Sequence, residues 1–295
     1  MARALELPSK PIPRRGNTFW ETVATGGRLL ALIVLVVAAV AFVFPLVWML
    51  STSLKTEGEV FAVPPIWIPA KLMWSNYPAS LTYFPFFPYL TNTLIVTLPS
   101  VVGTLVSSAL SAYGFARVRW PGRDVVFTLV LATLLVPTWT TLIPVYILFA
   151  KMHWVGTFLP LIIPNFLGNP FYIFLLRQFF LRQPQELFDA AVIDGSSHIG
   201  FFTRILIPLS KPAMAVVALF SFMDSWRDFF NPLIYLNDEK MYTLSIGLYN
   251  FQSQHTTDWT TLMAASLLIA SPMIVLFFLT QRTFVEGITF TGIRG

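Results

Sequence analysis

Two polar stretches interrupt a largely apolar chain. The stretch nearer the C-terminus, DSWRDFFNP, carries the side chains best suited to binding a solute. Ionisable groups such as Asp224 cost roughly 2.5–3.5 kcal/mol each on membrane insertion unless they are paired or hydrated. On a helix, Arg227 can pair with Asp224, and Asp228 lies one turn from Asp224 on the same face. Hydrogen-bonding side chains beside an aromatic ring suit a sugar, so we expect a solute pathway lined by Trp226, Arg227, Asp228 and Asn231. The alternative is a self-neutralising structural network near the extracytoplasmic interface.

The second polar stretch, QELFDAAVIDGSSHIGFFTRILIPL, concentrates small residues between charged ones. Asp189 precedes Ala190 and Ala191, and the pair Asp194 and Gly195 follows. Small side chains allow a backbone to approach another surface closely, and glycine permits the positive φ with which two short helices meet at a sharp angle. These residues predict a helix that docks into a groove on a partner protein. The alternative is an ordinary loop between two apolar segments.

Enzymatic chemistry is not expected in this chain. No Gly-Lys dipeptide occurs, so the phosphate-binding loop typical of ATPases is absent. The histidines, His153, His198 and His255, are scattered over different segments, and neither an HExxH pattern nor a Gly-x-Ser-x-Gly nucleophile motif is present. There is no cysteine to act as a nucleophile or metal ligand. We therefore expect no catalytic residue, no metal site and no cofactor in the chain itself.

The composition predicts an all-α integral membrane protein. Of 295 residues, 56% are hydrophobic and 11% are charged, whereas roughly a quarter of a soluble domain is charged, and the mean hydropathy is +0.69. At about 1.5 Å per residue, each long apolar run can cross a hydrocarbon core of about 30 Å. Prolines within these runs predict kinks. We expect six transmembrane helices, at about 29–54, 89–115, 125–150, 158–180, 213–236 and 262–284.

The distribution of basic residues predicts the orientation, because the side richer in Lys and Arg faces the cytoplasm. The net charge of +5 reflects this rule, and we expect no nucleic-acid partner. The expected layout is a cytoplasmic tail at 1–28, an extracytoplasmic loop at 55–88, a core of five helices at 89–284 with a cytoplasmic docking loop at about 182–211, and a cytoplasmic tail at 285–295. The cytoplasmic side collects Arg3, Lys10, Arg14, Arg15, Arg28, Arg117, Arg119, Arg123, Arg177, Arg182, Arg204, Lys211, Arg282 and Arg294, against Lys55, Lys71, Lys151 and Lys240 outside.

The docking stretch also resembles a motif of the ABC-type importer permeases. Their cytoplasmic coupling loop has Glu-Ala-Ala, three residues, Gly, nine residues and then Ile-x-Leu-Pro. Here Asp189, Ala190 and Ala191 take the first three places and Gly195 the fourth, while Ile207 stands where Leu is usual. Other fragments resemble the carbohydrate-uptake branch, and within it the second permease of maltose-type transporters. They are Asn76-Tyr77, Asn92-Thr93, Ala112 to Arg117, Phe174 to Phe179, Trp226 to Leu233 and Gly287 to Gly295.

The resemblance implies a type I ABC importer permease fold in the cell membrane, with both termini cytoplasmic. It implies a second permease subunit, two ATPase subunits that hold ATP and Mg²⁺, an extracytoplasmic solute-binding protein, surrounding lipid and a sugar substrate. The docking residues would contact an ATPase. Where the family usually has Asn after the tryptophan, this chain has Arg227. Two alternatives stay open: a permease for a non-sugar solute, and an ion-coupled secondary transporter that uses Asp224 and Asp228.

Overall fold

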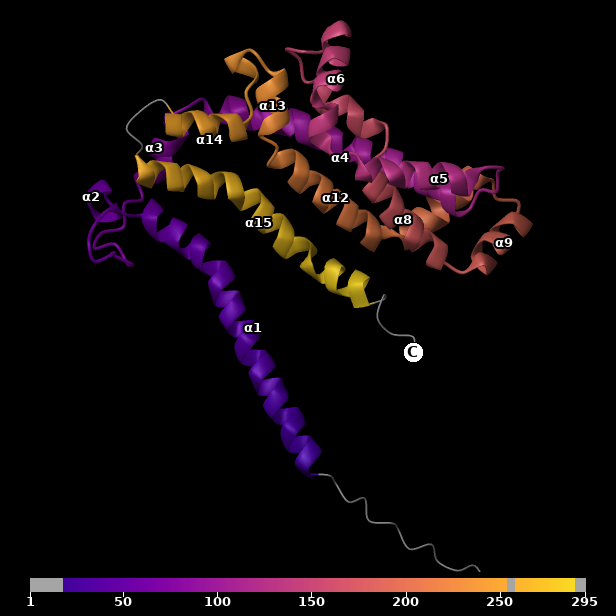
Figure 1. The fold of residues 1–295 in the computed structure, drawn as a ribbon, viewed down its shortest axis with the longest axis horizontal. Coiled ribbons are helices and arrows are strands. Elements are labelled where there is room, and N and C mark those ends of the chain that lie inside the picture. The colour runs from indigo at the N-terminus through magenta and orange to yellow at the C-terminus, as the bar shows by residue number, and fades with distance from the viewer. Residues whose placement is uncertain (1–17, 254–257, 290–295) are drawn as a thin grey trace, which may run out of the picture.

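Four long helices form the body of the molecule in the computed structural model, which describes residues 18–253 and 258–289. They are α4 (Phe86–Ala116), α8 (Pro170–Arg182), α12 (Lys211–Trp226) and α15 (Trp259–Thr289). α8 and α12 pack on α4, and α15 packs on α12 (Figure 1). α4 and α15 have 31 residues each, so either is long enough to cross a hydrocarbon core of about 30 Å. Every regular element in the described residues is helical, which confirms the all-α prediction.

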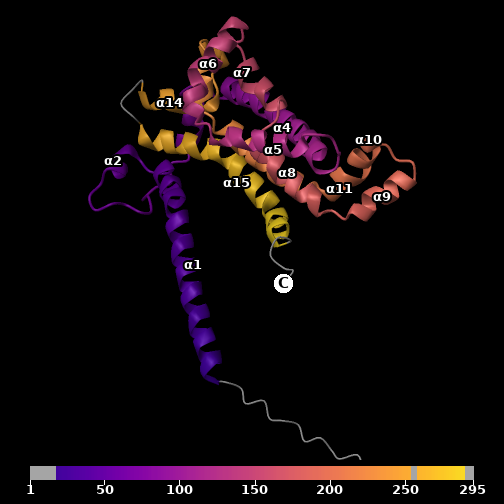
Figure 2. The same cartoon turned by 45° about the vertical axis from the view of Figure 1, so that its right-hand side comes forward.

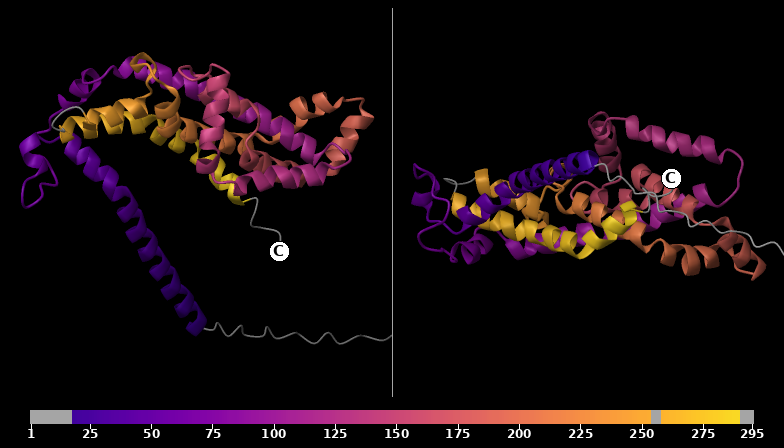
Figure 3. Two further views of the ribbon diagram at one scale, coloured as in Figure 1. Left: turned by 45° about the horizontal axis from the view of Figure 1, so that its top comes forward. Right: turned by 90° about the horizontal axis from the view of Figure 1, so that it is seen from below.

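A further long helix, α1 (Thr18–Ser53), leaves this body at one end and runs outward on its own (Figures 1 and 3). Its most apolar stretch has a mean hydropathy of 3.1 and no buried residue within this chain. A helix that is apolar on all sides needs lipid or another apolar surface around it. Its end is fixed by Asn76, whose amide donates to the carbonyls of Ser53 (2.9 Å) and Lys55 (3.0 Å). The connection to α4 contains α2 (Glu57–Val60) and α3 (Asn76–Thr82).

The segment expected as a third span, 125–150, consists of two helices with a corner between them. α5 (Arg123–Ala132) continues as a 3₁₀ turn, η1 (Thr133–Leu135), and α6 (Thr138–Lys151) departs at 100°. The corner lies at Pro137, which has no N–H for a helical hydrogen bond and whose ring would clash with the preceding turn. The expected kink is therefore a sharp bend that carries α6 away from the body (Figure 1).

The fourth span is interrupted near its prolines and glycine. α7 (Leu159–Ile162) and the 3₁₀ turn η2 (Ile163–Phe166) precede a break in the helix at Gly168, whose φ is +95°. The side-chain oxygen of Asn169 then caps α8 by accepting a backbone N–H at 3.0 Å. η2 packs closely on α4 at Gly103, where a Cβ would lie 2.5 Å from the ring of the last η2 residue. Only glycine allows this approach without displacing the ring.

The fifth span expected at 213–236 is not one helix, because α12 ends at Trp226. Pro232 lies four residues after Asp228 and has no N–H to donate to the Asp228 carbonyl. That carbonyl accepts from the hydroxyl of Ser245 at 2.6 Å instead. The freed backbone is thus satisfied by a neighbouring segment, as broken membrane helices require. The chain continues through α13 (Phe230–Tyr235), η4 (Glu239–Met241) and α14 (Leu244–Ser253).

Four to six membrane helices fit the described residues. The segments Gly27–Ser53, Phe86–Ala116, Leu159–Arg182 and Trp259–Gln281 are each long and apolar enough to span a membrane. Two bent pairs bring the total to six if each pair counts as one span. The α1–α4 connection and α14 lie at one end of the body, whereas the α4–α5 connection and α9 (Gln185–Ile193) lie at the other (Figure 1).

Candidate functional site

The stretch between α8 and α12 forms a compact group of short helices, here called the docking segment (residues 185–209), at one end of the body (Figure 2). It consists of α9, α10 (His198–Phe201), the π-helical turn η3 (Phe202–Leu206) and α11 (Ile207–Leu209). The helices that the sequence predicts on either side of Gly195 are therefore present. The segment packs on the ends of α4 and α8 through one hydrophobic cluster.

α9 ends in a Schellman motif centred on Gly195. The φ of Gly195 is +77°, a conformation that side chains with a Cβ disfavour. The N–H of Ser196 donates to the carbonyl of Ala191 at 2.8 Å, and the N–H of Gly195 donates to that of Val192 at 3.0 Å. Asp194 occupies the C-cap position before the glycine. This glycine therefore sets the direction in which the chain leaves α9 for α10.

The predicted docking residues divide between two faces of the segment. Ala191 is buried in the cluster shared with α4 and α8, with 5% of its surface exposed. Asp189, Ala190, Asp194 and Gly195 are exposed. Uncovered apolar side chains lie beside them, namely Val192, Ile193 and Ile199, which are 53%, 85% and 75% exposed. The exposed face thus combines small and apolar groups, which is typical of a surface that another protein covers.

Arg117, at the end of α4, ties the docking segment to the body. Its guanidinium donates to the carbonyls of Phe180 (2.6 Å) and Gln183 (2.5 Å) and to the side-chain oxygen of Gln185 (2.7 Å). Burial lowers the pKa of Arg117, and electrostatic interactions with Tyr113 and Asp189 oppose this shift. The group stays cationic at neutral pH, because arginine is not deprotonated in proteins. One side chain therefore joins the ends of α4 and α8 to the start of α9.

Tyr113, one turn before Arg117, makes a second connection. Its hydroxyl lies 2.9 Å from Nδ1 of His198 and donates to the His198 carbonyl at 3.3 Å. The Phe188 ring packs edge-on against Phe201 at 5.0 Å, so α9 and α10 close over the tyrosine. Sequence reasoning missed both anchoring roles. The sequence signal for both residues is the fragment Ala112 to Arg117, which served above only as a resemblance to the permease family.

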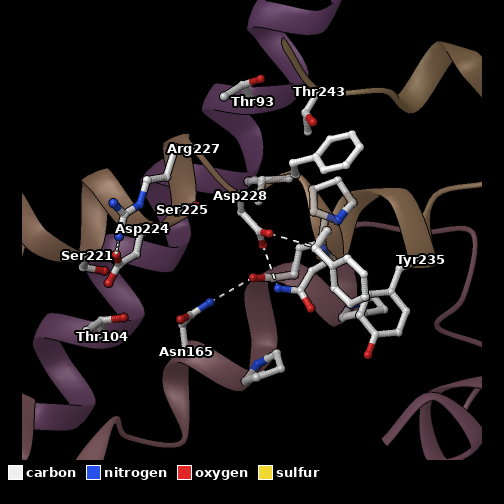
Figure 4. A pocket seen from close by; sticks show the side chains of 18 of the residues that line it. Thr93, Thr104, Asn165, Ser221, Asp224, Ser225, Arg227, Asp228, Tyr235 and Thr243 are labelled. Carbon is white, nitrogen blue, oxygen red and sulfur yellow. Dashed lines mark hydrogen bonds and ion pairs between the residues drawn. The ribbon is translucent and has the colours of Figure 1, made fainter. Parts of the chain in front are cut away.

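A cavity of about 700 Å³ lies beside the break between α12 and α13 (Figure 4). α4, α6, α7, η2, α8, α12 and α13 all contribute to its wall. Its polar lining is Thr93, Thr104, Asn165, Asn169, Ser221, Asp224, Ser225, Arg227, Asp228, Asn231 and Thr243. Its aromatic lining is Phe149, Tyr172, Phe229, Phe230 and Tyr235. A volume of this size, with polar groups set among aromatic rings, is typical of a small-molecule site.

An ion pair and a phenol form one side of the cavity. Arg227 Nη2 lies 2.8 Å from Asp224 Oδ1, which is the pairing that the sequence predicts. The hydroxyl of Tyr172, from α8, donates to the other Asp224 oxygen at 2.8 Å. Both charged side chains are more than half exposed, 64% for Arg227 and 56% for Asp224. They are therefore available to solvent or solute within this chain.

Asp228 projects into the cavity separately from this pair (Figure 4). Its carboxylate accepts from the backbone N–H (3.2 Å) and the side-chain amide (2.9 Å) of Asn231. The expectation that Asp224 and Asp228 share one helical face is wrong, because α12 ends between them. The break instead presents Asp228 and Asn231 together.

Trp226 does not line the cavity. It is 4% exposed, stacks on Phe222 with ring centroids 5.2 Å apart, and donates its indole N–H to the Ile269 carbonyl at 3.0 Å. Its expected role as an aromatic surface for a solute is therefore not supported by its position. None of the five aromatic residues in the wall is among the sequence-based candidates. Tyr235 stacks on Tyr146 of α6 at 6.0 Å, and Phe230 lies on the same short helix as Tyr235.

The family of binding-protein-dependent transport system inner membrane components matches residues 103–289, more than half of the chain. The chain belongs to this family. The matched region contains the docking segment, the break after α12 and most of the cavity wall. The two features described above thus lie within the part of the permease that the family shares.

Relatives of this permease match it over nearly the full length of both chains. The arabinooligosaccharides transport system permease protein AraQ of Bacillus subtilis is 33% identical over 260 residues, which cover 86% of this chain and 91% of AraQ. The diacetylchitobiose uptake system permease protein DasC of Streptomyces coelicolor is 29% identical over 270 residues, which cover 91% of this chain and 98% of DasC.

A solved structure shows that the fold is that of a type I ABC importer permease. The match is a chain of a bacterial ABC transporter involved in the import of the acidic polysaccharide alginate. The TM-score is 0.77, with 21% sequence identity, over 92% of this chain and 99% of the other. The predicted fold class and family resemblance are confirmed, as is function as a multi-pass membrane permease of a binding-protein-dependent importer. The roles of individual docking and cavity residues stay predictions.

Proposed function

We propose that this permease imports a sugar or related carbohydrate, with its docking segment receiving an ATPase subunit and its cavity forming part of the solute pathway. The observation that carries the proposal is the docking segment. It exposes Ala190 and Ile193 on one face and is fixed to α4 and α8 on the other through Arg117 and Tyr113. A surface held in this way can pass a displacement to the membrane helices.

α4 supports the link between docking and transport. It carries Tyr113 near one end and contributes Thr93 and Thr104 to the cavity wall. α8 does the same, because Phe180 accepts the Arg117 hydrogen bond while Tyr172 reaches Asp224. When ATP closes the two ATPase subunits, movement of the docking segment shifts both helices and changes access to the cavity. ATP and Mg²⁺ belong to those partners, so this chain is not itself an enzyme.

The cavity chemistry supports a carbohydrate as cargo. Sugars combine hydroxyl groups with apolar ring faces, and the cavity offers carboxylates and amides beside the rings of Phe230 and Tyr235. The names of AraQ and DasC refer to arabinooligosaccharides and diacetylchitobiose. By analogy, an extracytoplasmic binding protein delivers the solute and a second permease completes the pathway.

Transport by the reconstituted complex tests this proposal. The chain is co-expressed with its partner subunits, and uptake of labelled oligosaccharide into vesicles is measured with binding protein and ATP. Ala190→Arg places a long cation on the docking face and is expected to lower uptake more than tenfold, whereas the matched control Ala190→Ser retains it. Uptake that follows an ion gradient without ATP would identify a secondary transporter. ATP-driven uptake of only non-sugar solutes would reject the carbohydrate assignment.

The proposed orientation places the docking segment and both termini in the cytoplasm. The α4–α5 connection and the docking segment lie at the same end of the body, and that end carries the basic residues Arg117, Arg119 and Arg204. A reporter enzyme that is active only outside the cytoplasm should be active when fused near Lys71 or Lys240. Activity at Arg119 with silence at Lys71 would reverse the topology.

A further inference from the structure

The corner between α4 and α5 contains a second cavity, of about 370 Å³, away from the cavity described above. Arg119, Trp120, Gly122, Arg123 and Asp124 contribute to its lining. α4 and α5 both belong to candidate membrane spans, which end at Ala116 and begin at Arg123. The connection between them therefore lies at a membrane interface, whichever way the protein is inserted. A pocket of this size is within the range of small-ligand sites.

The cavity has an excess of positive charge. Asp124 is shared by Arg123, whose Nε lies 3.0 Å away, and Arg177, whose Nη2 lies 3.8 Å away. Arg119 is exposed and, in the described part of the chain, has no hydrogen-bond or ion-pair partner. Two guanidinium groups, those of Arg119 and Arg123, thus line the cavity with one carboxylate, which Arg177 approaches from outside the lining. Guanidinium forks match the geometry of phosphate oxygens, so the cavity suits a phosphate-bearing ligand.

The position of Trp120 is typical of a tryptophan at a lipid interface. Its indole N–H donates to the Gly114 carbonyl at 3.3 Å, and its ring packs on Phe115 at 5.9 Å. The ring is nevertheless 36% exposed beside the arginines. An indole anchored in this way, next to arginines at the end of two spans, is the combination found at the headgroup level of a bilayer.

We propose that this corner binds the headgroup of an anionic phospholipid. The phosphate lies between Arg119 and Nη2 of Arg123, whose Nε and Nη1 donate to Asp124 and to the Val118 carbonyl. The acyl chains follow the outer surface of α5, where Val125 and Leu129 are 66% and 62% exposed. Charge complementarity selects an anionic lipid over a zwitterionic one. A bound lipid also restricts the motion of the end of α4 directly after Arg117, whose guanidinium donates to Gln185 of the docking segment.

Lipid retention by the intact detergent-solubilised complex tests the proposal. Native mass spectrometry measures the binding of phosphatidylglycerol, phosphatidylcholine and inorganic phosphate in separate arms. The wild-type complex should retain phosphatidylglycerol in preference to phosphatidylcholine. Arg119→Gln is expected to weaken phosphatidylglycerol about fivefold, which corresponds to about 1 kcal/mol per surface arginine. Arg182→Gln is the matched control, because Arg182 is an exposed arginine at the end of another span and does not line the cavity.

Other results would overturn the assignment. Equal retention of the two lipids, or equal losses in Arg119→Gln and Arg182→Gln, would show a non-specific surface charge. An effect of Arg119→Gln on inorganic phosphate alone would assign the corner to a free anion. Loss of an ATPase subunit without loss of lipid would assign it to a protein contact. Arg119→Lys keeps the charge and should retain most of the lipid, which distinguishes lost binding from a folding defect.

Discussion

The docking segment and the cavity are both polar regions in an apolar chain, yet they are built in opposite ways. The docking segment is continuous, and the hydrogen bonds that shape the end of α9 join residues five or fewer positions apart. The cavity collects residues from Thr93 to Thr243, on seven helical elements and the segments between them. A continuous segment can be recognised as a motif, whereas an assembled site exists only after the helices have packed.

This difference predicts different responses to substitution. The geometry of the docking segment depends on a few unique contacts, above all the guanidinium of Arg117 and the positive φ of Gly195. The cavity has many polar groups, and several of them satisfy one another, as Asp224 does with Arg227 and Tyr172. We expect single substitutions in the docking segment to reduce transport strongly. Single substitutions in the cavity should change transport only slightly.

The largest effect is expected for Arg117→Met. It removes three charge-assisted hydrogen bonds, so we expect a loss of about 3 kcal/mol in the stability of this corner. Uptake should fall more than tenfold and the melting temperature of the complex should drop. Arg182→Met, an exposed arginine of α8, is the control. An unchanged melting temperature and unchanged uptake in Arg117→Met would show that Arg117 does not link movement of the docking segment to transport.

A smaller but specific effect is expected for Gly195→Val. The left-handed backbone costs a side-chain-bearing residue about 1–2 kcal/mol, although there is open space around the missing Cβ. We expect the angle between α9 and α10 to change, so that solute imported per ATP hydrolysed falls several-fold. Gly195→Asn should keep most of this ratio, because asparagine tolerates a positive φ. Equal ratios in both variants would remove the Schellman motif from the coupling route.

The smallest effect is expected for Asp228→Asn in the cavity. The amide keeps an acceptor for the Asn231 backbone N–H but loses the charge, a difference of about 1 kcal/mol. Assembly should be normal and the KM for uptake should rise a few-fold, with basal ATP hydrolysis unchanged. Loss of the assembled complex would instead support the structural-network interpretation. Wild-type uptake of every solute, here and in Arg227→Ala, would place these residues outside the solute pathway.

The sequence by itself determined the membrane-embedded all-α class and the docking motif. Long uncharged runs can satisfy their backbone in lipid only as helices, and the spacing from Asp189 to Gly195 carries its own capping chemistry. The pairing of Asp224 with Arg227 was also predictable, because a spacing of three residues lies within one helical turn. These features depend on neighbours along the chain.

Only the tertiary structure decided where the chain breaks and which side chains face the cavity. Pro232 alone does not determine the end of α12, because the break also needs the hydroxyl of Ser245, from another segment, to donate to the freed Asp228 carbonyl. Trp226 became a core residue because α15 supplies a carbonyl for its indole N–H. Arg117 became an anchor because the ends of α8 and α9 meet it there. In each case the deciding partner is distant in sequence, so no local pattern could have placed it.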